Sequence, residues 1–201
     1  GRLVVSVFAP DTLIEQLGGP AKTKALLNEM DARLQRANLP PIHWNAMLRN
    51  PEKVAPCRDA GFHSTTGYNI TDAGKTSPGL TQEYEDLMVA HRREWQSMSA
   101  APLPYFPVVT MGWDVTPRCE HQVPFPFAKP HYPYGHVVVG NTPERFGRLC
   151  QQAAEFAAND PKRPAAVVVN AWNEWTEGSY LLPEARHGTA YLEALCRAFG
   201  R

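Results

Sequence analysis

Short apolar runs and segments of helical periodicity alternate along the chain. The stretch "LVVSVFA" (3–9) is continuously apolar and rich in β-branched residues, which predicts a strand buried on both faces. After two glycines, segment 20–39 opens with Pro20 and carries apolar residues at helical spacing, which predicts a helix. These apolar residues are Ala25, Leu26, Met30, Leu34 and Ala37.

The same rhythm continues to the end of the chain. Further strands are expected at 41–47, 62–69, 105–111 and 165–172, where β-branched and aromatic residues gather. Further helices are expected at 51–62 (interrupted by Pro56), 81–98, 142–160 and 188–200. Thr142 followed by Pro143 is typical of a helix N-terminus.

Five strand-then-helix units of this kind predict a parallel sheet with helices packed outside it, in an α/β fold. A doubly wound sheet would favour a Gly-rich phosphate turn after an early strand, and "APDTLIEQLGG" (9–19) is not one. A (β/α)8 barrel of the TIM type needs roughly 250 residues. The 201 residues are therefore interpreted as a single domain, 1–201, that is the C-terminal part of such a barrel, with about three units missing upstream.

Charge and composition narrow the class of partner. Lys plus Arg equals Asp plus Glu, at 20 each, and no basic run stands out, which argues against a nucleic-acid partner. No window is apolar enough to span a membrane, and the first residues do not resemble a signal peptide, which decides little because the native start is expected to lie upstream. The compartment stays undecided between cytoplasm and periplasm or exterior, with the cytoplasm slightly favoured. The four cysteines are scattered without metal-ligand spacing, so neither a metal nor a cofactor is expected.

Functional groups of α/β folds collect at the carboxyl ends of the strands. Here those ends carry aromatics, amides and acids, the mixture that stacks on pyranose rings and hydrogen-bonds their hydroxyls. For His43 and Tyr68 taken singly, packing is the favoured explanation. The candidate sugar-binding residues are His43, Trp44, Tyr68, Asn69, Trp113, Asp114, Arg118, Asn170, Trp172, Asn173 and Trp175.

Glu174 and Glu177 lie three residues apart beyond the last predicted strand, among tryptophans. Apolar walls and an ionised neighbour raise the pKa of the less solvated acid of such a pair. The pair would then supply one proton donor and one base, as glycoside cleavage requires. A structural alternative is that both acids begin a short helix and favour its N-terminal dipole.

The loop between 116 and 141 holds five of the 19 prolines and many aromatics, including Phe125, Phe127, Tyr132 and Tyr134. A sugar-binding lid and a proline-stiffened rim would both look like this. Its histidines follow no metal-ligand motif. Asp114, just before this loop, and Arg118, near its start, would either bind an anionic sugar or form an ion pair that holds the loop.

Three blocks of the sequence resemble a known family. "NAWNEWTEGSYLLPE" (170–184), followed by "HGTAYLEAL" (187–195), is similar to the C-terminal signature of the glycoside hydrolase family 99-like domain, also called the WbsX glycosyltransferase family. "VVTMGWDVTPR" (108–118) resembles a second block of that family. The resemblance covers about the last hundred residues, with weaker support from "AGFHSTTGYN" (60–69).

The resemblance implies a (β/α)8 barrel and a catalytic role for the two glutamates. By comparison with the family 99 endo-α-mannosidases and mannanases, Glu174 would be the base and Glu177 the acid/base. Cleavage would retain anomeric configuration through a 1,2-anhydro sugar. The "WDVTPR" block belongs more to the WbsX-like branch, so mannose does not follow as the substrate.

Three functions are therefore carried forward. The first is a carbohydrate-active enzyme, a retaining glycoside hydrolase acting on a polysaccharide or glycan. The second is a glycosyltransferase in the biosynthesis of cell-surface polysaccharide, of the O-antigen type. The third is a non-catalytic glycan-binding barrel that kept the fold and the tryptophans.

Overall fold

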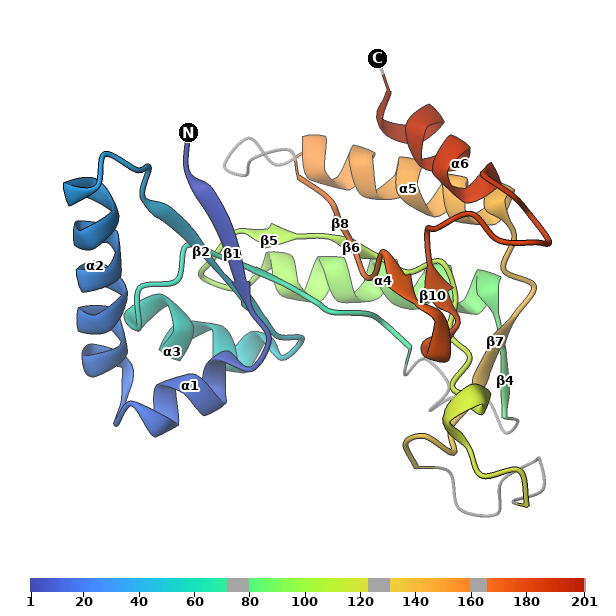
Figure 1. Cartoon of the computed structure of the whole chain (residues 1–201), viewed down its shortest axis with the longest axis horizontal. Coiled ribbons are helices and arrows are strands. Elements are labelled where there is room, and N and C mark those ends of the chain that lie inside the picture. Colours follow the sequence, from blue (N-terminus) through green and yellow to red (C-terminus); the bar gives the residue numbers. More distant parts are fainter. Residues whose placement is uncertain (72–79, 123–130, 160–165, 201) are drawn as a thin grey trace. The chain divides into compact units, whose positions relative to one another are not determined.

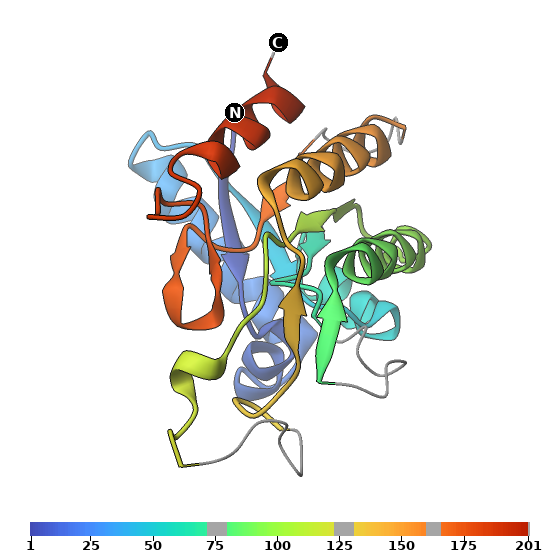
Figure 2. The same cartoon turned by 90° about the vertical axis from the view of Figure 1, so that its right-hand side faces the viewer.

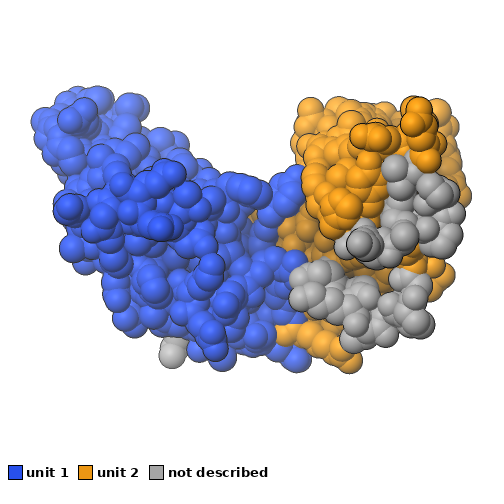
Figure 3. Space-filling view, turned by 90° about the horizontal axis from the view of Figure 1, so that it is seen from below, with its two compact units in different colours: residues 1–68, 94–107, 162–164 blue, residues 69–93, 108–161, 165–201 orange. Residues whose placement is uncertain are grey.

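The computed structural model describes residues 1–71, 80–122, 131–159 and 166–200. Its residues cluster into two compact units, which Figure 3 shows in different colours. Among the described residues, unit 1 comprises Gly1–Tyr68 and Glu94–Pro107, and unit 2 comprises the remainder. The carboxylates of Glu174 and Glu177 therefore belong to unit 2.

Unit 1 is built on a parallel sheet with the strand order β1-β2-β3-β5 (Figure 1). Val5 lies opposite Trp44 in the register of the first pair. Each strand forms inside a segment predicted as strand, although most are shorter than expected. The strands are β1 (Leu3–Val7), β2 (Ile42–Met47), β3 (Ser64–Thr66) and β5 (Tyr105–Phe106).

The first strand forms as predicted but is not buried on both faces. Leu3, Val4 and Val5 are 47%, 65% and 39% exposed. Within the described chain, β1 is hydrogen-bonded to β2 alone. The predicted burial is therefore wrong for this structure. An apolar run shows that the side chains of a strand are suited to burial, but it does not show whether neighbouring elements cover them.

The helices of unit 1 include the predicted one after the double glycine. Gly19, at φ 111°, precedes Pro20 at the first helical position. The buried residues of this helix are Thr23 and Leu27, whereas Leu26 and Met30 of the predicted apolar set are about 40% exposed. The elements are α1 (Pro10–Gln16), α2 (Pro20–Arg36), the 3-10 turn η1 (Pro51–Lys53) and α3 (Val54–Asp59).

The described residues of unit 2 form three separate strand pairs. Two are parallel: β4 with β7, and β6 with β8. The third is the antiparallel hairpin of β9 and β10. The elements are β4 (Thr81–Glu83), β6 (Val108–Val109), η3 (Thr116–Arg118), β7 (Val137–Val139), β8 (Val168–Val169), β9 (Asn173–Glu174), η4 (Trp175–Glu177) and β10 (Ser179–Tyr180).

Three helices accompany these strands: α4 (Tyr84–Ser99), α5 (Pro143–Ala158) and α6 (Ala190–Phe199), of which α4 continues into unit 1. The N-cap of α5 is confirmed, since the Thr142 hydroxyl accepts from the Arg145 N–H at 3.3 Å. The helix predicted from residue 81 begins three residues later, because 81–83 pair with β7. Helices α5 and α6 pack side by side (Figure 2).

A buried polar cluster ties α4 to the end of β6. The Tyr84 hydroxyl donates to the Thr110 carbonyl at 2.6 Å. His91 Nδ1 lies 2.8 Å from the Leu87 carbonyl, and its Nε2 lies 3.2 Å from the Thr110 hydroxyl. Because Tyr84, His91 and Thr110 are fully buried, these bonds fix where the chain leaves β6 and enters the loop that follows.

The described elements confirm a mixed α/β fold with parallel strands. They lie in four sheets, the largest with four strands, and within the described residues none of these sheets closes on itself. Pro107 separates β5 from β6 in one extended stretch, which fits the absence of a backbone N–H in proline. Closure into a (β/α)8 barrel remains a prediction.

Candidate functional site

The two glutamates flank a tight turn between β9 and β10. Glu174 pairs with Ser179 in the hairpin, and η4 fills the space between them. Gly178 ends η4 in the left-handed region at φ 61°. A Cβ at this position would lie 2.8 Å from both Cβ and N of Asp114, so only glycine allows this approach.

The hairpin is anchored to the end of β6 by buried hydrogen bonds. Asn170 Nδ2 donates to the Ser179 hydroxyl at 2.8 Å, and that hydroxyl lies 2.9 Å from the Gly112 carbonyl. Asn170 is 8% exposed and Ser179 is fully buried. Asn170, predicted to bind sugar, therefore helps to hold residues 174–177, here called the acidic turn, in place. The sequence did not predict the contribution of Ser179.

The loop after β6 presents Arg118 to the turn. The Asp114 N–H donates to the Glu177 carbonyl at 2.8 Å, which joins the loop to η4. Asp114 Oδ1 accepts from the Thr116 N–H at 2.9 Å and from the Thr116 hydroxyl at 2.6 Å. The carboxylate of Asp114 therefore shapes η3, and it forms no ion pair with Arg118 in the described structure.

Both glutamates converge on the guanidinium of Arg118. Its Nη2 lies 2.9 Å from Glu174 Oε1, and its Nη1 lies 3.0 Å from Glu177 Oε1. Its Nε donates to the Thr176 hydroxyl at 2.8 Å. That hydroxyl donates in turn to Glu174 Oε1 at 2.7 Å. One planar cation is therefore shared by the two predicted catalytic acids.

Tyr132 completes the cluster. Its hydroxyl donates to Glu177 Oε1 at 3.1 Å and accepts from Arg118 Nη1. The sequence placed Tyr132 in an aromatic lid or rim without linking it to the acids. Phe125 and Phe127 of the same predicted lid lie outside the described residues.

The two acids differ in environment. The side chain of Glu177 is 9% exposed and that of Glu174 is 33% exposed. The hydrogen bond from Thr176 and the positive charge of Arg118 lower the pKa of Glu174, against an opposing effect of desolvation. Glu174 caps η4 through its backbone position alone, and Glu177 lies at the far end of that turn, so a helix dipole does not explain both acids.

The tryptophans beside the acids are partly open to solvent. Trp172 is 55% exposed and Trp175 is 44% exposed. Trp175 stacks on Tyr180 at 4.0 Å between ring centroids, with 29° between the planes. Asn173 is exposed as well, whereas Trp113 is half-buried. Large exposed aromatic faces next to carboxylates are the surfaces on which sugar rings stack.

The other predicted site residues make contacts of their own. His43 Nε2 lies 2.7 Å from the Ser64 hydroxyl, and its ring stacks on Phe106. Trp44 is 4% exposed, and the Tyr68 ring meets Phe8 edge-on. These contacts lie within unit 1, and Asn69 is a buried residue of unit 2. A shared role with the glutamates remains a prediction for all four.

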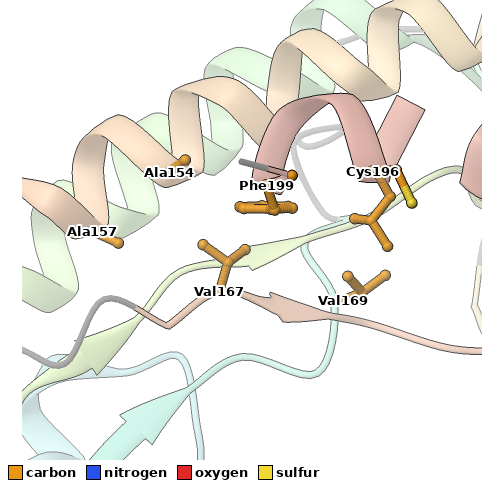
Figure 4. Close-up of a pocket in the computed structure, with 8 residues that line it drawn as sticks. Ala154, Ala157, Val167, Val169, Cys196 and Phe199 are labelled. Atoms are coloured by element: carbon orange, nitrogen blue, oxygen red, sulfur yellow. The ribbon is translucent and has the colours of Figure 1, made fainter. Parts of the chain in front are cut away.

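An apolar cavity of about 530 Å³ lies between α5, β8 and α6 (Figure 4). None of the residues that line it belongs to the acidic turn. Its lining consists of aliphatic groups, one thiol and one aromatic ring, and it offers few partners for sugar hydroxyls. The labelled lining residues are Ala154, Ala157, Val167, Val169, Cys196 and Phe199. This cavity is therefore not the candidate sugar site.

Metal-ligand clusters and membrane-spanning helices are two further features that bear on the class of protein. In the part of the chain that the structure describes, no group of three His, Cys, Asp or Glu side chains is arranged to hold a metal ion. None of the described helices combines the length and apolar character needed to cross a membrane. The cysteines Cys57, Cys119, Cys150 and Cys196 are free thiols.

Comparison with known proteins connects this site to a family. The chain is 34% identical over 167 residues to a protein described as "Uncharacterized protein WxcX" from Xanthomonas campestris pv. campestris, which covers 78% of this chain and 22% of that protein. A WxcX protein of strain B100 is 34% identical over 97 residues, or 48% of this chain and 12% of that protein. The chain thus spans about a fifth or less of the length of these relatives.

The family match is more extensive than either relative. The family described as "Glycosyltransferase WbsX" matches residues 15–195, which include most of both units and the whole acidic turn. This confirms the resemblance noted in the three sequence blocks. Its description agrees with a carbohydrate-active enzyme and does not separate hydrolysis from glycosyl transfer. The chain belongs to the glycosyltransferase WbsX family.

Proposed function

We propose that this chain carries the catalytic acid pair of a retaining glycoside hydrolase that acts on a polysaccharide or oligosaccharide. The observation that supports this most is the convergence of the Glu174 and Glu177 carboxylates on one guanidinium. Two acids held together beside exposed tryptophans have the composition that glycoside cleavage requires.

The proposed chemistry divides the work between the acids. Glu174, whose pKa is lowered by Thr176 and Arg118, is ionised at neutral pH and can act as a base. It takes the proton of the sugar 2-hydroxyl, whose oxygen attacks the anomeric carbon. Glu177 gives a proton to the departing glycosidic oxygen as that bond breaks. Water then opens the 1,2-anhydro ring, with Glu177 as base and Glu174 returning the proton to O2, so two inversions give net retention.

The fold proposed for this enzyme is a (β/α)8 barrel to which this chain contributes the C-terminal strands. Parallel strands alternating with helices support it, and the acids follow the carboxyl end of β8, where barrel enzymes place catalytic groups. Among the described strands β1 pairs with β2 alone, so its other edge is open to pairing with a further strand, and a closed barrel would cover its exposed apolar side chains.

The family description supports a second candidate. A glycosyltransferase of cell-surface polysaccharide assembly would use the same acid pair and tryptophans at its acceptor sugar, with a nucleotide-sugar donor bound elsewhere in the full-length protein. A binding module without turnover is the third outcome. The hydrolase cleaves a glycan with water, the transferase requires a nucleotide sugar, and the binding module turns over neither. One set of assays can therefore separate the three functions.

The test compares native-length protein with Glu174→Gln and Glu177→Gln on a panel of polysaccharides and aryl glycosides. Release of reducing ends or aryl alcohol measures hydrolysis, and proton NMR of the first-formed anomer measures retention. Each substitution is expected to lower turnover about 10²–10⁴-fold, because each removes an acid–base group. Glu155→Gln, an exposed glutamate on α5, is the matched control.

The outcomes are distinct. Unchanged hydrolysis in both variants would reject the acid pair as catalytic groups. Activity that strictly requires a nucleotide sugar would favour the transferase. Sugar binding without turnover in the unmutated protein would favour the binding module.

A further inference from the structure

Arg118 is the residue that the two acids share. Its three guanidinium nitrogens reach three different residues of the acidic turn: Thr176, Glu177 and Glu174. These partners are 56 to 59 positions later in the sequence, so the contact exists only because the η3 loop folds onto η4. A single side chain thereby sets the orientation of both carboxyl groups.

We propose that Arg118 is a positioning residue, which clamps Glu174 and Glu177 by their Oε1 atoms and stays in place when a sugar binds. This inference rests on the proposed function, because it assigns a role within that acid pair. It differs from the sugar-binding role that the sequence suggested for Arg118.

The contacts favour a clamp over a sugar-binding arginine. The bonds from Arg118 and from the Thr176 hydroxyl both use Oε1 of Glu174, which leaves Oε2 outside the clamp for a substrate hydroxyl. The positive charge of Arg118 is already matched by the ionised Glu174 carboxylate, so the guanidinium offers no unpaired charge to an anionic sugar group.

The planar guanidinium is essential to this arrangement. Arg presents its N–H groups in a fixed fork that can bond several acceptors at once, whereas Lys offers one compact ammonium. Asp114 holds the η3 turn through Thr116, so the backbone of Arg118 is also fixed. Its side chain is 34% exposed, and ion pairs at such sites add little to stability. Orientation of the acids is therefore the larger consequence.

The first test follows the titration of Glu174, which needs no substrate. The charged and titratable groups facing it are Arg118, Tyr132 and Glu177, with Asp114 on the adjoining loop. The carboxyl carbon of Glu174 is followed by ¹³C NMR in the native protein and in Arg118→Met, Arg118→Lys and Arg118→Ala. Its signal is assigned by its loss in Glu174→Gln.

The pKa of Glu174 is expected to rise in Arg118→Met and Arg118→Ala, because the positive charge that favours the carboxylate is gone. In Arg118→Lys the pKa of Glu174 should lie between its value in the native protein and its value in Arg118→Met, because an ammonium keeps the charge without the fork of N–H groups. Millimolar guanidinium chloride added to Arg118→Ala should bring the titration back toward the native one, while ammonium chloride at equal ionic strength should not. Arg148→Met, which removes an exposed partner of Glu85, is the control.

A Glu174 titration in Arg118→Met that coincides with the native one would overturn the proposal. If Arg118→Met and Arg118→Ala fail to fold, Tyr132→Phe keeps the test open, since it removes one partner of Arg118 Nη1 and of Glu177. That variant should alter the Glu177 carboxyl signal, and an unaltered signal would count against the cluster.

Turnover provides a second and separate readout. On any glycan cleaved by the native protein, Arg118→Met should lower kcat about 10- to 100-fold by misplacing the acids, with KM nearly unchanged. The acid limb of its pH profile should move to higher pH. A rise in KM alone would mean direct sugar contact and would overturn the clamp. Absence of any turnover in the native protein would reject the hydrolase, while the titration would still decide the role of Arg118.

Discussion

The strand ends of unit 1 and the strand end after β8 in unit 2 carry similar residue types and use them differently. In unit 1, His43 meets the Ser64 hydroxyl and the Phe106 ring beside it in the same sheet. In unit 2, Glu174 and Glu177 meet a guanidinium that arrives on a separate loop.

The difference shows that composition at a strand end does not by itself define a site. The Nε2 of His43 finds a partner in the neighbouring strand, and burial lowers the pKa of His43, as does the nearby His63. Two acids that share one cation must both face the same point in space. The convergence of charged groups from different loops, and not their number, distinguishes the acidic turn.

The largest effect expected from this contrast concerns glycines. Gly178→Ala should destabilise the protein by about 2–4 kcal/mol, because a left-handed φ is combined with a Cβ overlapping the backbone of Asp114. It should also abolish most glycan turnover, since it pushes the Arg118 loop away from the acids. Thermal melts and the glycan panel measure both effects.

Gly61→Ala in unit 1 is the matched control. Its φ of 91° is also left-handed, but the nearest atom is Cγ of the flexible Lys24 side chain at 3.3 Å. We expect a cost of about 1–2 kcal/mol with turnover preserved. Equal loss of turnover in both variants would break the distinction between the two regions.

Two buried serines give a smaller and more balanced comparison. Ser179→Ala removes the bonds that its hydroxyl makes with the Asn170 amide and the Gly112 carbonyl, and Ser64→Ala removes those with His43 Nε2 and Asn45 Nδ2. Each should cost roughly 1–3 kcal/mol in urea unfolding. Only Ser179→Ala should change the Glu174 and Glu177 carboxyl signals in ¹³C NMR, and a change in Ser64→Ala would contradict this.

Much of the fold follows from local patterns. The strand-then-helix rhythm and the Thr142 N-cap were predictable because they depend on neighbouring residues. The start of α4 was misjudged, since segment 81–83 looks helical locally but pairs with β7 more than fifty residues away. The exposure of β1 escaped prediction for a similar reason, because burial depends on a neighbour and not on the strand itself.

The two acids of the proposed site were singled out by the sequence, whereas the side chains that contact them were mostly missed. Glu174 and Glu177 stood out as a rare pair among tryptophans, and the structure places them together. The roles of Arg118 and Tyr132 depend on where two loops fold, which no local spacing encodes. Thr176 lies inside the same short string, and a hydroxyl two residues from a carboxylate is a signal that could have revealed it.

The smallest effect expected is a shift in pH dependence. Thr176→Val removes the hydrogen bond that contributes most to the lowered pKa of Glu174. The pKa of Glu174 is lower in the folded protein than its value of about 4.3 in the unfolded chain. The stability that this bond adds is therefore present above about pH 4.3 and is lost as the pH falls through the pKa of Glu174 in the folded protein. Thr176→Val should therefore melt below the native protein at neutral pH, with the difference vanishing in acid.

Thr189→Val supplies the comparison for this change. Its hydroxyl donates to Glu193 Oε1 at 2.7 Å on exposed α6, so it breaks the same kind of bond outside the acid pair. Thr176→Val should move the acid limb of glycan turnover to higher pH, since Glu174 then gains its proton sooner as pH falls, and Thr189→Val should leave that limb in place. Coincident acid limbs for Thr176→Val and the native protein would mean that Glu174 is not the base whose ionisation limits the reaction.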